Sequence, residues 1–288
     1  MFENVEAFYR PATVREALQL LQRGKGKAQI VAGCTDVMLE GGGDVRFLID
    51  ITRAGLSYIR KRDSQWSLGA TTTMAEIEHS PAMRGLAGGL LTRAAATCGS
   101  VQIRNMATVG GNMSNGSPAA DLATPLLALD AVAVVFQGTG RRKMPLGAYL
   151  TRARSRELRD SLLIEIAFPA PPSGVRCGWS FQKFGRTEVD ISVVNVASGL
   201  QLDSRCRVKW ARVAIGAVAP MPLRLAALEE AMVGQTFDQT LLTETCESVM
   251  HLIQPIDDVR ASAEYRRELS RVLTGRALEE CALRGCSI

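Results

Sequence analysis

The chain has 288 residues, of which 47% are hydrophobic and 22% are charged, and its formal net charge is +5. This length allows two domains, and the composition is that of a globular protein. The longest apolar runs, such as residues 131–136, are too short to span a bilayer. The first six residues lack the basic-then-apolar pattern of a signal peptide. We therefore expect no membrane span and a cytoplasmic location.

The cysteines and the basic residues argue against three kinds of protein: a disulfide-rich protein, an iron–sulfur protein and a nucleic-acid-binding protein. The seven cysteines are an odd number at scattered positions, which fits reduced thiols better than a disulfide framework. No four-cysteine pattern for an iron–sulfur cluster is present, so any cluster that works with this protein must lie on another chain. The densest basic region, residues 141–159, contains a single aromatic residue, Tyr149. This favours a solvated face or a protein-docking surface over a nucleic-acid site.

Capping residues and apolar periodicity predict the elements of the first half. Thr13 to Glu16 and Thr73 to Glu76 have the capping-box spacing and each opens a helix, the first of which ends at Gly24. A helix over 121–129 would have Asp121 in its first turn, where a negative side chain is favoured. A further helix is expected over 81–98. Short apolar runs predict strands at residues 28–32, 47–51, 66–70, 131–136 and 162–168.

A proline-rich break divides the chain. Residues 169–174, Pro-Ala-Pro-Pro-Ser-Gly, interrupt every regular pattern, and we place the domain boundary after residue 172. The domain 173–288 is expected to be α+β, with strands followed by helices. In the domain 1–172 no G-x-G-x-x-G follows the first strand, which disfavours a Rossmann unit. The elements expected beyond the break are strands at 178–184, 191–202 and 208–217 and helices at 241–252 and 261–283.

Two glycine-containing turns are the most informative positions. Gly110 and Gly111 follow a polar, strand-like run at 102–108, and Gly33 follows the apolar run 28–31. Glycine permits a positive φ and lets a ligand approach the main chain, and successive exposed N–H groups form an anion-binding concavity. Two such concavities in one domain predict a ligand with two adjacent phosphates, namely a dinucleotide.

Five stretches also occur in a recognisable order. They are Ala-Gly-x-Thr-Asp at 32–36, Leu-Gly-Ala-Thr-Thr at 68–72, Gln-Ile-Arg-Asn-x-x-Thr-x-Gly-Gly-Asn at 102–112, Ser-Pro-Ala-Ala-Asp at 117–121, and residues 257–266. Together they resemble the FAD-binding subunits of the molybdenum hydroxylases, the relatives of xanthine dehydrogenase and carbon monoxide dehydrogenase. The resemblance covers nearly the whole chain.

The resemblance implies a fold. Residues 1–172 would form a PCMH-type, that is vanillyl-alcohol-oxidase-type, α+β FAD-binding domain with subdomains at about 1–55 and 56–172. Residues 173–288 would form the C-terminal domain of carbon monoxide dehydrogenase flavoproteins, an α+β domain with a three-stranded sheet and helices.

The resemblance also implies an FAD site. Main-chain N–H groups and the Thr35 hydroxyl would hold the pyrophosphate, and Asp121 would accept hydrogen bonds from ribose hydroxyls. Ile103 would lie beside the isoalloxazine ring, and Leu163 would pack on the adenine or the ring. Lys183 would place a cation near the flavin N1/O2 edge, where it stabilises the anionic reduced ring. The predicted cofactor-binding residues are Val31, Ala32, Gly33, Cys34, Thr35, Asp36, Ile103, Ala107, Thr108, Val109, Gly110, Gly111, Asn112, Asn115, Ser117, Asp121, Leu163 and Lys183.

Simpler interpretations stay open for several of these residues. The Gly33 segment also fits an ordinary turn into a helix. Asp121 also fits a helix cap, Ile103 and Leu163 also fit core positions, and Lys183 also fits a solvated strand edge.

Two positions depart from the family pattern or leave its register open. The family usually has glycine where this chain has Cys34, and a positive φ there would strain cysteine. An inert buried thiol is the simpler interpretation of Cys34. Relatives carry the flavin lysine at the Gln182 or the Lys183 position, and Arg186 is a second candidate for the cation.

The implied function is electron transfer. A molybdopterin centre on a large partner subunit would hydroxylate the substrate, and electrons would pass through two 2Fe-2S clusters on a small partner subunit to FAD on this chain. The acceptor would be NAD+, oxygen or another carrier. We expect no catalytic side chain here, because the flavin would carry out the redox step. We also expect no metal site, because the two histidines, His79 and His251, lie in no metal-binding spacing.

Two alternatives use the same fold. A stand-alone FAD-dependent oxidase should show a proton-abstracting residue and often a histidine or cysteine for covalent flavin attachment, and histidine is scarce. A flavin-free assembly protein is favoured by Cys34 alone.

Overall fold

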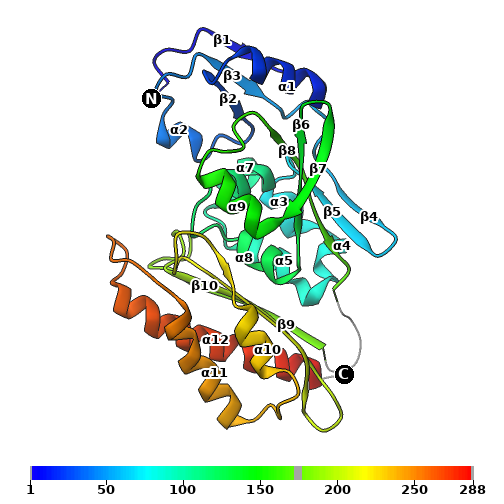
Figure 1. Cartoon of the computed structure of the whole chain (residues 1–288), viewed down its shortest axis with the longest axis vertical. Coiled ribbons are helices and arrows are strands. Elements are labelled where there is room, and N and C mark those ends of the chain that lie inside the picture. Colours follow the sequence, from blue (N-terminus) through cyan, green and yellow to red (C-terminus); the bar gives the residue numbers. More distant parts are fainter. Residues whose placement is uncertain (1, 172–176, 287–288) are drawn as a thin grey trace. The chain divides into compact units, whose positions relative to one another are not determined.

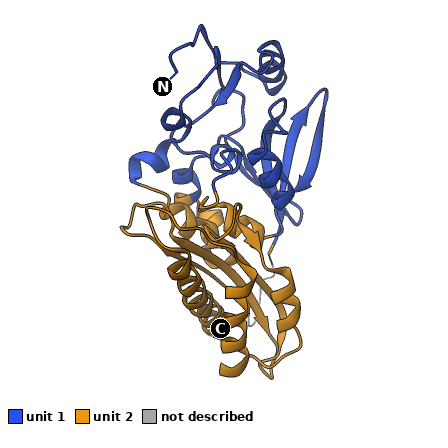
Figure 2. Cartoon of the chain, turned by 60° about the vertical axis from the view of Figure 1, so that its left-hand side comes forward, with its two compact units in different colours: residues 1–77, 100–117, 130–170 blue, residues 78–99, 118–129, 171–288 orange. Residues whose placement is uncertain are grey.

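A computed structural model describes residues 2–171 and 177–286 of the chain (Figure 1). It contains two compact units that interleave along the sequence (Figure 2). The break predicted at 169–174 falls partly on residues 172–174, which lie outside the described residues. Unit 1 comprises Met1–Ile77, Ser100–Ser117 and Asp130–Ala170, and unit 2 comprises Glu78–Gly99, Pro118–Leu129 and Pro171–Ile288.

Unit 1 begins with a small parallel sheet of order β1-β3-β2. Half of the predicted capping box forms at the start of its helix: Thr13 Oγ1 accepts a hydrogen bond from the Glu16 amide at 3.2 Å, but the Glu16 carboxylate accepts from the Ala12 amide instead of the Thr13 amide. This helix buries Ala17, Leu18 and Leu21. The elements are β1 (Ala7–Tyr9), α1 (Val14–Arg23), β2 (Ala28–Val31), α2 (Val37–Glu40) and β3 (Phe47–Asp50).

A five-stranded antiparallel sheet of order β4-β5-β8-β6-β7 completes unit 1. The three central strands were predicted, whereas the edge strands β4 and β7 were not, because both are largely basic and exposed and lack an apolar pattern. The strands are β4 (Ile59–Arg62), β5 (Gln65–Gly69), β6 (Val132–Gln137), β7 (Gly140–Pro145) and β8 (Leu162–Pro169). The helices are α3 (Met74–His79), which runs on into unit 2, α6 (Val101–Met106), α7 (Val109–Ser114) and α9 (Leu146–Arg154).

Unit 2 is built on an antiparallel sheet of order β12-β11-β10-β9, which has one short strand more than predicted. The long helix α12 packs along β9 and β10, and α11 packs on α12 (Figure 1). Val194, Val196 and Leu200 of β10 join Leu273 and Leu278 of α12 in one buried apolar cluster. The strands are β9 (Cys177–Phe184), β10 (Val194–Leu202), β11 (Val208–Gly216) and β12 (Leu223–Arg224). The helices are α4 (Pro81–Arg84), η1 (Ala87–Gly89), α5 (Leu90–Ala96), α8 (Ala123–Ala128), α10 (Ala226–Met232), α11 (Gln239–Leu252) and α12 (Ala263–Cys286).

Three predictions about local structure are wrong. The expected helix 81–98 is broken into α4, η1 and α5, because Ala87, Gly88 and Gly89 have φ of 48°, 57° and 76°. The expected strand-like run and turn at 102–112 are instead the two short helices α6 and α7, capped by the side chains of Ser100 and Thr108. Asp121 precedes α8, which begins at Ala123, and so does not lie in its first turn.

Within the described parts of the chain, no helix is both long enough and apolar enough to cross a bilayer.

Candidate functional site

The two predicted phosphate-binding segments of unit 1 touch at the main chain. A Cβ built on Gly33 would lie 1.8 Å from the carbonyl oxygen of Met106 and 3.1 Å from the Cα of Ala107. No side chain fits into such a contact, so glycine is required here for close approach. The φ of Gly33 is not positive, and a left-handed backbone is therefore not the reason for this glycine. The contact joins the end of β2 to the end of α6.

The chain turns directly after this contact and leaves a run of donors free. Cys34 has φ 59°, the left-handed conformation that is strained for cysteine. The amides of Gly33, Cys34, Thr35 and Asp36 donate no hydrogen bond to any described residue, and the Thr35 hydroxyl also has no described partner. Consecutive free amides around a left-handed residue form a concave donor surface that suits an anion. A ligand oxygen or water must satisfy them.

The thiol of Cys34 is not activated at this turn. Its Sγ lies 3.5 Å from the carbonyl oxygen of Ala32, to which it donates. Burial, and to a lesser degree the charge of Asp50, raise the pKa of the Cys34 thiol above its usual value. The thiol therefore stays protonated near neutral pH, as a simple structural cysteine does.

The pair Gly110–Gly111 does not form the expected left-handed turn. Neither glycine has a positive φ, and both lie in the first turn of α7. A Cβ on Gly110 would lie 2.7 Å from the carbonyl oxygen of Ala70, so this glycine serves packing inside the protein. The amides that were expected to face phosphate already have acceptors: Val109 donates to Thr72 O at 2.9 Å, Gly110 to Ala70 O at 2.7 Å, Gly111 to Thr108 Oγ1 at 3.1 Å and Asn112 to Thr108 O at 2.9 Å.

Two other polar groups of this segment are without a described partner. The amide of Thr108 donates to no described residue, although Thr108 is only 4% exposed. Asn112 Oδ1 is buried and accepts no hydrogen bond. A buried polar atom without a partner is costly and points to a missing ligand or water. Thr108 and Asn112, rather than the glycine amides, are thus the groups of α7 left for a ligand.

Helix α6 places exposed apolar side chains in the same segment. Val101 is 59%, Ile103 38% and Met106 54% exposed. The alternative of a core role for Ile103 is therefore wrong. Exposed apolar side chains beside free main-chain donors suit a ligand that has both a flat apolar part and an anionic part.

The remaining predicted residues of unit 1 lie in less distinctive surroundings. Asn115 is exposed at the end of α7, and Ser117 is half-buried. Leu163 is 5% exposed and sits in β8 opposite Val135. Val31, Ala107, Val109 and Gly110 are buried, whereas Gly111 is exposed.

In unit 2 the predicted residues Asp121 and Lys183 meet each other. Lys183 Nζ lies 2.9 Å from Asp121 Oδ2 and donates to the carbonyl oxygen of Thr97 at 2.7 Å. The two charged side chains are 7% and 8% exposed, which rules out a solvated strand-edge lysine. An ammonium group has three donors, so one of those on Lys183 remains available.

Asp121 is the centre of a buried polar network. Its Oδ1 accepts hydrogen bonds from Ser192 Oγ at 2.6 Å and Asn195 Nδ2 at 3.3 Å, while Asn195 Oδ1 accepts from Thr124. Burial raises the pKa of the Asp121 carboxyl, and the charge of Lys183 acts in the opposite direction. Without Lys183 this carboxylate would be a buried uncompensated charge.

The second candidate cation is placed differently. Arg186 Nε lies 3.3 Å from Asp190 Oδ2, and its side chain is 57% exposed in the loop between β9 and β10. The sequence did not single out Thr97, Ser192 or Asn195, which hold the Asp121–Lys183 pair. No spacing along the chain connects these residues, since three separate segments of unit 2 bring them together.

Comparisons with known proteins agree with this geometry. Residues 2–171 match the family described as the FAD binding domain in molybdopterin dehydrogenase, and residues 179–281 match the CO dehydrogenase flavoprotein C-terminal domain. The chain belongs to the FAD-binding subunits of the molybdenum hydroxylases. The family's cofactor is FAD, and its members are subunits of oxidoreductases.

Relatives of this FAD-binding subunit align over almost their whole length. A xanthine dehydrogenase FAD-binding subunit of Escherichia coli O157:H7 is 31% identical, over 95% of each chain. The 6-hydroxypseudooxynicotine dehydrogenase complex subunit alpha of Paenarthrobacter nicotinovorans is 30% identical, over 92% of this chain and 90% of that one. Among solved structures, a carbon monoxide dehydrogenase from Hydrogenophaga pseudoflava superposes with a TM-score of 0.90 at 28% identity and covers all of both chains.

The groups left without partners in unit 1 fit the cofactor of this family. The free amides of residues 33–36 and the Thr35 hydroxyl are donors, as the oxygens of a pyrophosphate require. The buried acceptor Asn112 Oδ1 suits a ribose or ribityl hydroxyl. The exposed side chain of Ile103 offers an apolar surface for a ring.

Proposed function

We propose that this chain is the electron-transfer subunit of a multi-subunit molybdenum hydroxylase. It receives electrons from 2Fe-2S clusters on a small partner subunit and passes them through FAD to NAD+ or another acceptor. Substrate hydroxylation takes place on a large partner subunit that binds molybdopterin. The observation that carries this proposal is the contact of Gly33 with Met106, because it sets four consecutive free amides beside the segment of α6 that carries the exposed apolar side chains of Ile103 and Met106.

The residues of the chain have separate tasks in this proposal. The amides of residues 33–36, the Thr35 hydroxyl and the Thr108 amide bind the pyrophosphate, as charge-assisted hydrogen bonds to phosphate are strong. Asn112 accepts from a sugar or ribityl hydroxyl. Ile103 contacts the isoalloxazine ring. When bound, FAD supplies the redox chemistry, and the protein binds and orients it and sets its electrostatics.

Lys183 is the proposed cation near the flavin N1/O2 edge. Two of its three donors are used by Asp121 and Thr97, which fixes the ammonium group in place and leaves one donor for the flavin. The residue at 183 is therefore preferred to Arg186, which is exposed and paired with Asp190.

The partner subunits are proposed from the names of the relatives. One relative is a subunit of a dehydrogenase complex and another is a carbon monoxide dehydrogenase medium chain, 28% identical over 94% of this chain. Cytoplasmic location remains part of the proposal and is supported by six cysteines among the described residues that form no disulfide.

Reduction of the flavin in the native complex tests the proposal. The complex is purified from its source, the accompanying chains are identified, and the flavin absorbance is followed anaerobically after substrate is added. The flavin should bleach with substrate and recover on addition of NAD+ or another carrier. A chain that takes up no FAD would support the flavin-free assembly protein. An isolated holoprotein that oxidises small alcohols or amines with oxygen would support the oxidase.

A further inference from the structure

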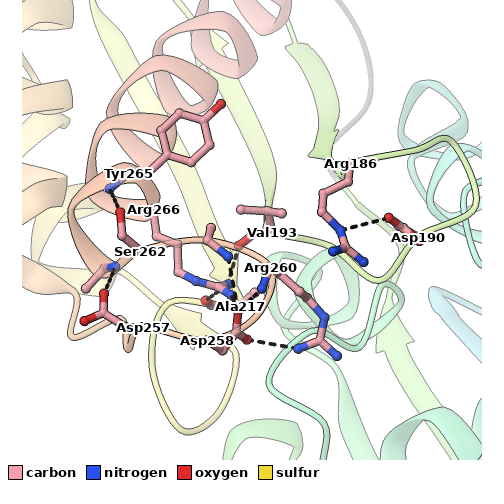
Figure 3. A network of polar contacts seen from close by, with 12 residues as sticks. Arg186, Asp190, Val193, Ala217, Asp257, Asp258, Arg260, Ser262, Tyr265 and Arg266 are labelled. Atoms are coloured by element: carbon pink, nitrogen blue, oxygen red, sulfur yellow. Dashed lines mark hydrogen bonds and ion pairs between the residues drawn. The ribbon is translucent and has the colours of Figure 1, made fainter.

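The stretch 257–266 is one of the five that carry the family resemblance, but no function was predicted for it. It contains a buried arginine, Arg266, in the first turn of α12 (Figure 3). Arg266 is 3% exposed. Its Nη2 lies 2.7 Å from Asp258 Oδ1, and its Nη1 donates to two main-chain carbonyl oxygens, that of Val193 at 2.7 Å and that of Ala217 at 3.0 Å. A buried guanidinium is stable only with such partners, and its planar fork fixes all three at once.

Asp258 is itself held firmly. Its carboxylate accepts from the amides of Arg260 at 2.8 Å and Ala261 at 3.2 Å and from Arg260 Nη1 at 2.9 Å. Burial alone would raise the pKa of Asp258, but these hydrogen bonds and that from Arg266 lower it to about 2. The carboxylate therefore stays ionised and keeps Arg266 oriented throughout the neutral range.

The first of the two carbonyls that accept from Arg266, that of Val193, belongs to a segment that contacts the Asp121–Lys183 pair. Val193 is the last residue of the loop between β9 and β10, and the preceding residue, Ser192, donates its hydroxyl to Asp121. At the other end of this loop, Phe184 packs edge-on against Tyr265 of α12, with ring centroids 6.1 Å apart. Both ends of the loop are thus fixed to the first turn of α12.

The second carbonyl, that of Ala217, belongs to a residue that is hydrogen-bonded to the segment carrying Asp121. Ala217 has φ 66°, an uncommon conformation for a residue other than glycine. It is held by Arg266 at its carbonyl and by the carbonyl oxygen of Pro118, which accepts from its amide at 2.7 Å. Pro118 lies three residues before Asp121 in the chain.

We propose that Arg266 is a positioning residue for the cofactor: through the carbonyls of Val193 and Ala217 it fixes the two segments that hold the Asp121–Lys183 pair. The inference rests on the proposed function, in which Lys183 sets the charge beside the flavin. Arg266 touches neither Lys183 nor Asp121 and acts through the main chain. Its loss should therefore loosen the loop between β9 and β10 and displace Lys183, even where the fold survives.

The test compares Arg266→Lys with Arg271→Lys in the full-length, FAD-loaded chain. Lysine keeps the charge but loses the fork that reaches two carbonyls and a carboxylate together. Arg271 is the matched control, because it lies on the same helix and, among the described residues, its ion pairs are with Glu268 and Glu247, whose side chains are about half exposed. Asp258→Asn serves as a second variant, since it keeps the shape of the side chain and removes the ion pair.

Two measurements test the two parts of the proposal separately: that Arg266 fixes the loop between β9 and β10, and that this loop positions Lys183 at the flavin. The first is the rate of tryptic cleavage after Arg186, the exposed site in the loop, relative to cleavage after Arg205 in the β10–β11 turn. Loss of one hydrogen bond to a charged group should raise this ratio about ten-fold or more. The second is the midpoint potential and absorption spectrum of the bound flavin. We expect Arg266→Lys and Asp258→Asn to change both readouts and Arg271→Lys to change neither.

Each other outcome has a definite meaning. If neither readout changes in Arg266→Lys, or if cleavage rises while the flavin potential and spectrum stay as in the wild type, Arg266 does not position the cofactor. A wild-type chain that binds no FAD overturns the proposed function and the flavin part of this inference with it. The cleavage ratio, measured without flavin, still decides whether Arg266 anchors the loop.

Discussion

The most direct perturbation of the phosphate-binding segments is Gly33→Ala. The added Cβ would lie 1.8 Å from the carbonyl oxygen and 2.5 Å from the carbonyl carbon of Met106. Both are main-chain atoms, so the segments must separate by more than about 1 Å to reach ordinary contact. Overpacking of this kind costs about 1–3 kcal/mol of stability. The separation should also break at least two hydrogen bonds to phosphate, at about 1.5 kcal/mol each or more, which lowers the affinity for FAD about 100-fold.

Two measurements on the purified chain check this prediction. Urea unfolding gives the loss of stability, and titration of the apoprotein with FAD gives the affinity. Gly140→Ala is the matched control, because a Cβ on Gly140 meets no atom within 4 Å and no positive φ makes it strained. The control should leave both quantities unchanged. If Gly33→Ala binds FAD as tightly as the wild type, the two segments do not form the pyrophosphate site.

Three further predictions concern single side chains. Cys34→Gly should raise the free energy of unfolding by up to about 1 kcal/mol, because relief of the left-handed strain exceeds the entropy that glycine adds to the unfolded state; a loss of stability in urea would contradict this. Lys183→Ala leaves the Asp121 carboxylate buried and unpaired, so it should cost about 3–5 kcal/mol and lower the flavin midpoint potential. Combining Lys183→Met with Asp121→Asn should restore most of the stability, and no recovery would mean that the ion pair is not the cause. The pKa of Asp258 is about 2 in the folded protein and 3.8 for the free side chain, so its contribution is present above the free value and lost as the pH falls. As the pH falls from about 5 to 3, the free energy of unfolding measured in urea should therefore decrease less in Asp258→Asn than in the wild type.

Local signals in the sequence were sufficient for much of the fold. The capping box at Thr73 forms as predicted and Thr13 caps its helix with its side chain, since both depend on residues only three apart. The strands β2, β3, β5, β6 and β8 follow from short apolar runs. The edge strands β4 and β7 could not be found in this way, because their basic residues face solvent and only pairing with a neighbouring strand makes them strands.

The glycines show the limit of sequence reasoning at the site. Gly33 and Gly110 were both attributed to a left-handed backbone or to ligand approach, yet in the structure each admits another main-chain segment of unit 1. Contact between segments far apart in the chain leaves no local signal. The residue that does have a positive φ, Cys34, is not a glycine, and the family resemblance rather than its chemistry drew attention to it.

The buried polar network around Asp121 in unit 2 also depends on contacts between segments that are far apart in the chain. Asp121 and Lys183 were each predicted as FAD ligands from the family resemblance, and their placement as FAD ligands remains a prediction. Nothing in the sequence indicated that they pair, or that Ser192 and Asn195 complete the network. Such partners become evident only when the three segments of unit 2 that carry them are brought together.

A crystal structure of the FAD-loaded chain would show whether residues 33–36 and Thr108 bind the pyrophosphate. We expect the pyrophosphate oxygens within about 2.7–3.2 Å of the amide nitrogens of residues 33–36 and of Thr108. We also expect that the amides of Gly110 and Gly111 keep their present acceptors, Ala70 and Thr108. A pyrophosphate bound elsewhere, with the amides of residues 33–36 facing only water, would show that these amides do not form the FAD site.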